Sequence, residues 1–217
     1  DVIIRKGCQG KGLGKIIAGK SIVGQFFESA VLTAGKDVQA TYLLNCQLKA
    51  NGKLLVEGRK GVIIGGKTCA KLGISCNGIG NIAEIATVVS VGIDKEDMTA
   101  YQELQKKIEQ TQAELQTCEN GLNKLMANPV HDEKVSMMIQ RLTRAVYTLK
   151  SSRKELFSER NAQMEQMTKQ KEARIQVSGR AYPGTLLFLN EDPFAIKEIY
   201  NNVEFVKHDN RIDTLAH

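Results

Sequence analysis

The feature that most constrains the fold is a sixteen-residue repeat in the first half of the chain. Ala-Gly-Lys at residues 18–20 returns at residues 34–36, and related sequences that contain Gly-Lys follow at residues 48–55 and 63–69. Each is flanked by short runs with the period-2 alternation of a half-buried strand. One such rung cannot bury its own apolar side chains, whereas stacked rungs share a continuous core. The repeat therefore predicts a right-handed β-helix-like β-solenoid over residues 1–93.

Glycine and proline usage agrees with stacked strands. The chain has 19 glycines and only 3 prolines, and proline would remove hydrogen-bond donors from the ladders. We expect the glycine of each Ala-Gly-Lys corner to supply a backbone conformation with φ above zero.

A different interpretation arises from GKIIAGKS, because Gly14–Ser21 fits the phosphate-binding loop pattern at every required position. That loop needs a buried strand before its first glycine and a long helix after its serine. Here Gly14 follows a glycine-rich stretch, and Ser21 precedes β-branched residues and Gly24. The match is better explained by a solenoid corner, which makes nucleotide binding the least favoured function and predicts a strand after Ser21.

Residues 94–173 change to a period of 3.5, the spacing of a coiled coil. The seam breaks at Ala127–His131, where Pro129 ends the first helix and Asp132 is a suitable N-cap for the second. Two helices joined by a short turn fold back antiparallel, so this segment is predicted to be a hairpin inserted into the β structure. The expected seam residues are Tyr101, Leu104, Ile108, Thr111, Leu115, Cys118, Leu122 and Leu125, then Val135, Ile139, Leu142, Val146, Leu149, Leu156, Met164 and Met167.

Residues 174–217 return to β structure. Residues 173–178 and 185–189 are expected to be strands around a turn at Tyr182-Pro183-Gly184. Residues 194–199 and 203–206 are expected to form a second hairpin across Tyr200–Asn202. These strands should cap the open end of the solenoid, because an uncapped rung is an aggregation-prone edge.

Positive charge is concentrated in the solenoid segment, where residues 1–93 hold 12 Lys and Arg against 5 Asp and Glu. Rungs stacked in register would place Lys20, Lys36, Lys53 and Lys67 along one edge, the only candidate binding residues. This edge is either a solvated edge that discourages aggregation or a strip for an acidic protein or a polyanion. Aromatic residues for stacking are sparse there, so nucleic acid would bind only nonspecifically.

The remaining composition gives no enzyme signature, and we expect no catalytic residue, metal site or cofactor. Five scattered cysteines without a Cys-x-x-Cys pair favour reduced thiols in the cytoplasm. Asp37, Glu57 and Glu84 are isolated in sequence, so a paired-carboxylate site would form only if folding gathered them. The sequence lacks an apolar run of 18 residues, and no membrane span is expected.

The ordered set of motifs resembles the flagellar assembly protein A (FapA) family over essentially the whole chain. The resemblance rests on the Ala-Gly-Lys rungs, GRKGVIIGG at residues 58–66, TVVSVGID at residues 87–94, the coiled-coil hairpin and Tyr182-Pro183-Gly184. Longer members carry an additional N-terminal domain, which agrees with a chain that starts on a strand-like run at Asp1. The insertion at Cys8–Gly14 and Asn51 before Gly52 depart from the repeat.

The resemblance implies a cytoplasmic bacterial β-solenoid linked to polar flagellar assembly. It favours a non-enzymatic scaffold or adaptor whose partners are flagellar or polar-localisation proteins, and it leaves a homo-oligomer open. The alternative is a solenoid that interacts with a polyanion or polysaccharide.

Overall fold

The computed structural model describes residues 1–58, 60–127, 132–209 and 211–216. The chain divides into two compact units, which are considered separately. One comprises Asp1–Asp94 with Met167–His217, and the other comprises Lys95–Gln166.

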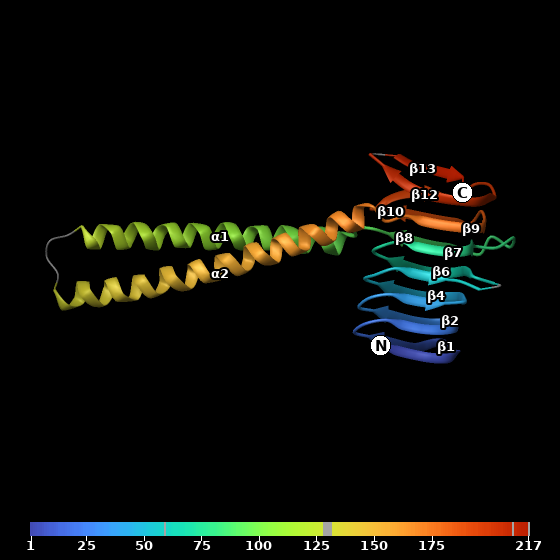
Figure 1. Cartoon of the computed structure of the whole chain (residues 1–217), viewed down its shortest axis with the longest axis horizontal. Helices are drawn as coiled ribbons and strands as arrows, with labels where there is room; N and C mark the ends of the chain where they lie inside the picture. The colour runs from blue at the N-terminus through green and yellow to red at the C-terminus, as the bar shows by residue number, and fades with distance from the viewer. Residues whose placement is uncertain (59, 128–131, 210, 217) are drawn as a thin grey trace. The chain divides into compact units, whose positions relative to one another are not determined.

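The first unit is a β-solenoid, as the repeat predicts (Figure 1). Its strands pair in parallel and lie one above another. In chain order they are β1 (Val2–Ala18), β2 (Ile22–Ala34), β3 (Val38–Ala40), β4 (Tyr42–Ala50), β5 (Leu54–Val56), β6 (Val62–Ala70), β7 (Ile74–Ile79), β8 (Thr87–Val91), β9 (Ile175–Ala181) and β10 (Thr185–Leu189).

The pairing register confirms the sixteen-residue period. Ile22 pairs with Val38 and Val38 pairs with Leu54, each sixteen residues on. Leu54 then pairs with Ile74, twenty residues on, and Ile74 pairs with Ile175 beyond the helical insertion. The coil interrupted by the helices is therefore followed in the ladder by the coil that resumes after them.

Each coil contains three paired segments, which we call first, middle and third. In the coil that starts at Ile22 these are residues 22–24, 26–28 and 30–34. We call the turns between them the first and second corners, and the turn to the next coil the third corner. The coils differ mainly in the length of their corners. The paired segments must keep their register, whereas the corners project outward and can take extra residues.

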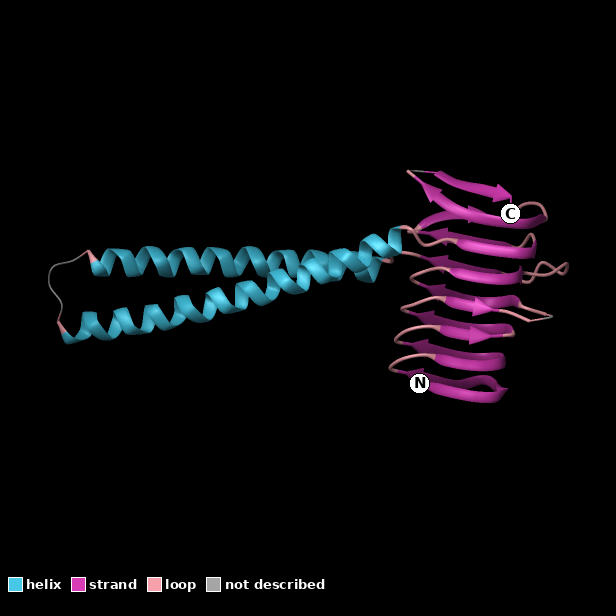
Figure 2. Cartoon of the chain, viewed as in Figure 1, coloured by secondary structure: helices cyan, strands magenta, loops and turns pink. Residues whose placement is uncertain are grey.

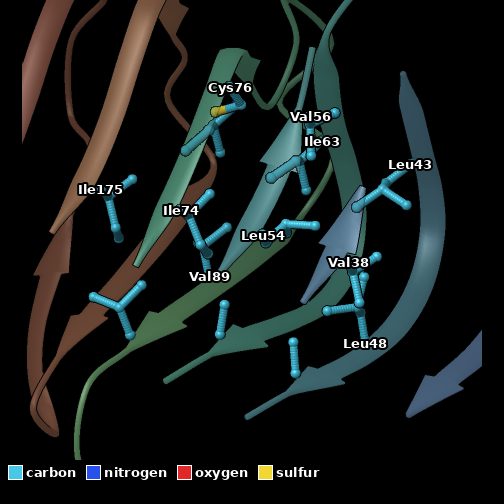
Figure 3. Close-up of a cluster of buried hydrophobic side chains, with 14 of the residues drawn as sticks. Val38, Leu43, Leu48, Leu54, Val56, Ile63, Ile74, Cys76, Val89 and Ile175 are labelled. Atoms are coloured by element: carbon cyan, nitrogen blue, oxygen red, sulfur yellow. The ribbon is translucent and has the colours of Figure 1, made fainter. Parts of the chain in front are cut away.

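Alternation along the segments sends every second side chain into a shared core. Ile22, Val38, Leu54 and Ile175 stack in the ladder and are all fully buried. Figure 3 shows Val38, Leu54, Ile74 and Ile175 pointing into the same interior from successive coils. Burying a side chain of this size contributes roughly 1.5–3 kcal/mol, so each coil adds several such increments.

The glycines of the Ala-Gly-Lys corners do not have the predicted backbone conformation. Positive φ occurs at the second corner in Ser29, Asn45 and Gly65, at the first corner in Gly58 and Gly61, and at the third corner in Gly73. At the third corner the reason for glycine is close stacking, because a Cβ on Gly35 would lie 2.2 Å from the carbonyl oxygen of Gly19. The predicted positive φ is therefore wrong for Gly19, Gly35 and Gly52, whereas Gly66 of the fourth repeat has a φ of 74°.

The C-terminal strands continue the two edges of the ladder. β11 (Asp192–Ala195) pairs antiparallel with β10, whereas β12 (Tyr200–His208) pairs antiparallel with β9 and with β13 (Arg211–Ala216). Phe205 lies 5.6 Å from Phe194 and 5.7 Å from Tyr200, measured between ring centroids, and this cluster closes the core.

The predicted hairpin across Tyr200–Asn202 is wrong, because these residues lie inside β12. Phe194 pairs back onto Leu187 of β10, while Val203 pairs with Val177 of β9. The segment between them therefore passes from one edge of the ladder to the other instead of turning back on itself.

The second unit is the predicted helical hairpin, formed by α1 (Lys95–Met126) and by α2 (Glu133–Lys171) up to Gln166 (Figure 2). Arg153 Nη1 donates to Gln112 Oε1 at 2.8 Å across the pair. The backbone N–H of Val135 donates to Asp132 Oδ1 at 2.8 Å, which confirms the N-cap. Pro129 and most of the predicted break lie outside the described residues.

The seam follows the predicted heptads, but only a few of its residues are buried. Leu104, Ile108 and Leu115 of α1 and Val146 of α2 are buried, and the other apolar seam residues are at most half-buried. Met164 is 57% exposed and does not belong to the seam.

The heptad position next to it is taken by Gln163, whose side-chain Nε2 donates to the Asp97 carbonyl oxygen at 3.5 Å. Steps of three and four from Arg160 lead to Gln163 and Met167, so the polar residue keeps the register that Met164 would break. In the described part of the chain, neither helix has the combination of length and apolarity that crossing a membrane requires.

Candidate functional site

The third corner holds the first three residues of the predicted lysine edge. The Lys36 backbone N–H donates to the Lys20 carbonyl oxygen at 3.0 Å, so these two lysines lie directly above one another. The Lys53 N–H donates to Asp37 Oδ1 at 2.7 Å, which places Lys53 above the aspartate. All three lysine side chains are exposed, but the column is offset by one residue after Lys36.

Lys67 does not belong to this corner. It lies within β6 and pairs with Gln47, whereas Ala70 pairs with the corner residue Ala50. The reason is the first corner of this coil, which has five residues, Glu57–Gly61, where the preceding coil has Thr41 alone. The insertion shifts the third corner four residues along the sequence, to Lys71.

Lys71 is a buried cation held by a carboxylate. Its Nζ lies 3.8 Å from Asp94 Oδ2, and Lys49 Nζ lies at the same distance from that oxygen. The Lys71 side chain is only 11% exposed, so its charge is compensated inside the protein and is not offered to a ligand. The exposed part of the lysine edge is therefore Lys20, Lys36 and Lys53, with Asp37 among them.

The phosphate-loop match is a solenoid corner, as the sequence predicts. Residues 14–18 pair with residues 30–34 as a strand, and β2 begins at Ile22 directly after Ser21. A helix N-terminus, which would direct backbone N–H groups and a positive dipole at a phosphate, does not follow Lys20.

The three isolated carboxylates stay apart. Asp37 lies at a third corner and accepts the Lys53 N–H, Glu57 lies at a first corner, and Glu84 lies in the second-corner loop after β7. No group of His, Cys, Asp and Glu large enough to hold a metal ion occurs among the residues that the structure describes.

The two buried cysteines are poor nucleophiles. Desolvation raises the pKa of the Cys46 thiol, and it raises the pKa of Cys76 to about 12. Only the thiolate is an effective nucleophile or metal ligand, so both side chains behave as small apolar core residues at neutral pH. All five cysteines are free thiols.

The solenoid also has an apolar outer surface that the sequence patterns did not predict. In the middle segments, Phe27, Leu43 and Ile63 point into the core and are essentially fully buried. Their neighbours alternate to the outside, yet all but one of these are apolar on the three coils concerned. We call the outer residues Phe26, Tyr42, Leu44, Val62 and Ile64 the apolar face.

A signal for this face was present in the sequence. Tyr42-Leu43-Leu44 and Val62-Ile63-Ile64 are apolar at three successive positions, where a strand with one solvated face would alternate. A cavity of about 590 Å³ adjoins the face at its first-corner edge and is lined by Gln25, Phe26, Thr41, Tyr42 and Lys60.

The model of the Flagellar Assembly Protein A beta solenoid domain matches residues 1–212. No curated protein and no solved structure matches the chain.

Proposed function

Because the chain belongs to the flagellar assembly protein A family, we propose that it is a non-enzymatic scaffold or adaptor in bacterial, polar flagellar assembly or its regulation. The match over residues 1–212 carries the proposal, since it spans both the solenoid and the helical hairpin. The activity would consist of contacts with other proteins, among them flagellar or polar-localisation factors.

The solenoid is suited to a rigid platform. Its corners are held by backbone hydrogen bonds from coil to coil, such as Gly52 N–H to the Lys36 carbonyl oxygen at 2.9 Å. Asn45 and Asn190 adopt the positive φ that their turns require. Asp37 Oδ1 accepts the Lys53 N–H, and Asn190 Oδ1 accepts the Ile93 N–H at 2.9 Å. Polar side chains at the corners thus support the backbone instead of converging on a reaction centre.

The helical hairpin is suited to a spacer or docking element. Its helices of 32 and 39 residues carry charged and polar residues around a narrow seam. Several large apolar side chains nevertheless remain exposed, including Met137, Met138 and Tyr147. These side chains are the ones through which we expect the hairpin to contact another protein.

The second candidate function is nonspecific polyanion or polysaccharide binding at the third corner. It is favoured by the exposure of Lys20, Lys36 and Lys53 on three successive coils. Asp37 lowers the local positive charge, so binding should be weak and should fall steeply with added salt.

The test is genetic. In a flagellated host that carries this gene, its deletion should reduce the number of flagella or displace them from the pole, and the full-length gene should restore them. A version with residues 95–166 replaced by a short Gly-Ser linker should restore them only if the hairpin is dispensable. Normal flagellar number and position after deletion would refute the proposal.

A further inference from the structure

We propose that the apolar face docks a segment of a partner protein that combines apolar side chains with carboxylates along one edge. The inference rests on the proposed scaffold function and names the surface through which that function would operate. It is carried by three features: the side chains of the face, the loops beside it and the charges at its edge.

The apolar face forms the floor of the proposed docking surface, and its side chains are not needed to fill the solenoid core. On the same three coils the third segments direct mostly polar residues outward, namely Thr33, Gln47, Lys49 and Lys67 beside Val31 and Cys69. The middle segments instead direct Tyr42, Leu44, Val62 and Ile64 outward, although the core beneath is already complete. Phe26 extends the floor to the neighbouring coil and is 39% exposed. Tyr42, Leu44, Val62 and Ile64 are half-buried, so the floor is a partly exposed apolar surface, and such surfaces are typical of interaction sites.

Two enlarged corners border the floor. The first-corner loop Glu57–Gly61 replaces the single residue Thr41, and the loop over residues 80–86 occupies the second corner one coil further. Both loops project from the same side of the stack (Figure 2). Ile82 on the second loop is 82% exposed, so the border of the floor adds apolar surface.

Hydrogen bonds fix the described ends of the first loop, Gly58 and Gly61, and one bond closes the second loop on itself, which favours a preformed border. Asn77 Nδ2 donates to the Gly58 carbonyl oxygen at 2.7 Å, and the Asn77 N–H donates to the Gly61 carbonyl oxygen at 2.8 Å. In the other loop the Ile85 N–H donates to Asn81 Oδ1 at 3.2 Å. A preformed surface loses little conformational entropy when a partner binds.

The charges select the chemistry of the occupant. Arg180 continues the outer column of Tyr42 and Val62, from which it is separated by Gly78, and Lys60 lines the adjoining cavity. Arg5 and Lys6 lie at the first corner of the first coil, and Glu57 is the acidic residue described on that edge.

The opposite edge carries Lys11 and Glu84, while Glu28 stands within the outer row and accepts a hydrogen bond from Gln9 at 3.1 Å. The cations thus concentrate along one edge, where carboxylates of a partner would meet them. Nucleic acid is the weaker match, because only Phe26 and Tyr42 offer rings for stacking bases and the other three residues of the face are aliphatic.

The direct test uses the whole chain and synthetic peptides of fifteen residues. The probes are a peptide of alternating Leu and Glu, the matching Leu-Lys peptide, and oligo-dT. We expect the Leu-Glu peptide to shift the NMR resonances of Tyr42, Leu44 and Ile64 and to bind at least about 10-fold more tightly than the Leu-Lys peptide. Absence of any shift at these residues, or stronger binding of oligo-dT there, would overturn the proposal.

Two variants separate the floor from the charged edge. Tyr42→Ser with Ile64→Thr should weaken Leu-Glu binding about 10-fold or more, and Lys60→Glu with Arg180→Glu should abolish the preference for Glu over Lys. Lys60 and Arg180 lie outside the core, so their variant should fold. It therefore still tests the proposal if the Tyr42→Ser, Ile64→Thr variant does not fold. The matched control is Gln47→Ser with Lys67→Thr on the neighbouring face, which should bind as the unmodified chain does.

The same variants distinguish failure of this inference from failure of the scaffold function. Should gene deletion remove flagella while the Tyr42→Ser, Ile64→Thr variant restores them fully, the scaffold function stands and the docking face is refuted. Should deletion leave flagella unchanged, the flagellar role fails, and the peptide titration alone decides whether the face binds acidic apolar segments.

Discussion

The solenoid and the helical hairpin bury their apolar residues in different ways. Ile22, Val38 and Leu54 each have a coil on both sides and are completely inaccessible to solvent. In the hairpin each seam residue packs against one partner helix, and Val146 is the single buried apolar residue described in α2. The solenoid core excludes water because each inner coil is covered by a neighbouring coil on both sides, whereas each helix of the hairpin has one partner.

This difference has consequences for cooperativity. Each coil is stabilised by its neighbours, so the loss of one core side chain weakens two interfaces at once. The hairpin is stabilised by local pairs along its length, so its parts can open separately.

Removing the Phe27 ring should produce the largest loss of stability. Phe27 is completely buried and packs over Gly24, where an added Cβ would lie 2.5 Å from Phe27 Cζ. Phe27→Ala removes this contact and leaves a cavity, which should lower the free energy of unfolding by about 3–5 kcal/mol. Guanidinium unfolding followed by circular dichroism would measure the loss.

The matched control for that experiment is the adjacent residue on the apolar face. Phe26 is 39% exposed, and Phe26→Ala should lower the free energy of unfolding by only about 1 kcal/mol, because less apolar area returns to water. Equal losses from the two substitutions would contradict the assignment of inner and outer rows.

Leu115→Ala should have the next largest effect and should remain local. Leu115 is among the most deeply buried residues of the hairpin, and its truncation should destabilise the two helices by about 2–3 kcal/mol. Hydrogen exchange measured by mass spectrometry should accelerate in peptides from α1 and α2 while peptides from β4 and β6 stay protected. Met137→Ala, at a residue 51% exposed, should change neither.

Parallel acceleration of exchange in the solenoid strands would contradict the local character of the hairpin. It would mean that the two units unfold as one cooperative body and that the contrast in burial does not translate into separate stabilities.

Much of the architecture could be predicted because its determinants are periodic. The register from Ile22 to Val38 to Leu54 repeats every sixteen residues, and the period is visible in the Ala-Gly-Lys corners. The seam residues Leu104 and Leu115 follow the heptad steps for the same reason. Stacking and coiling both translate a sequence period directly into a buried row.

The errors arose where a local insertion or an unusual environment interrupted the period. Lys67 resembles a corner lysine, but the loop Glu57–Gly61 displaces the true corner to Lys71. The apolar face was missed because outward-facing Leu44 and Ile64 look in sequence like additional core residues. Only the alternation observed around Leu43 and Ile63 assigns them to the surface.

Raising the pH should weaken the solenoid through Cys76. The folded state raises the pKa of this thiol from 9.0 to about 12, so above pH 9 the unfolded chain ionises while the folded chain keeps its proton. The folded state then binds more protons, and its stability falls by about 1.4 kcal/mol per pH unit between pH 9 and 12.

Urea unfolding at pH 8, 9 and 10 would measure this slope. Cys76→Ala removes the thiol, so its stability deficit relative to the unmodified chain should shrink as the pH rises, while the titration of all other groups cancels in the comparison. Two curves that stay parallel across this range would show that Cys76 is not protected from solvent as the core requires.

Asp37→Ala should have the smallest effect, because the third corner is held mainly by the backbone. The substitution removes the acceptor of the Lys53 N–H, but that N–H lies at an exposed corner where water replaces the carboxylate, so the loss should be about 0.5–1 kcal/mol. The same change leaves Lys20, Lys36 and Lys53 without the neighbouring negative charge. Heparin affinity measured at two salt concentrations should therefore rise, with a steeper dependence on salt. A loss of stability well above 1 kcal/mol would mean that the carboxylate, and not the backbone hydrogen bonds between coils, fixes the corner. The contrast between a solenoid stabilised along its whole backbone and a hairpin stabilised by local pairs would then fail at this corner.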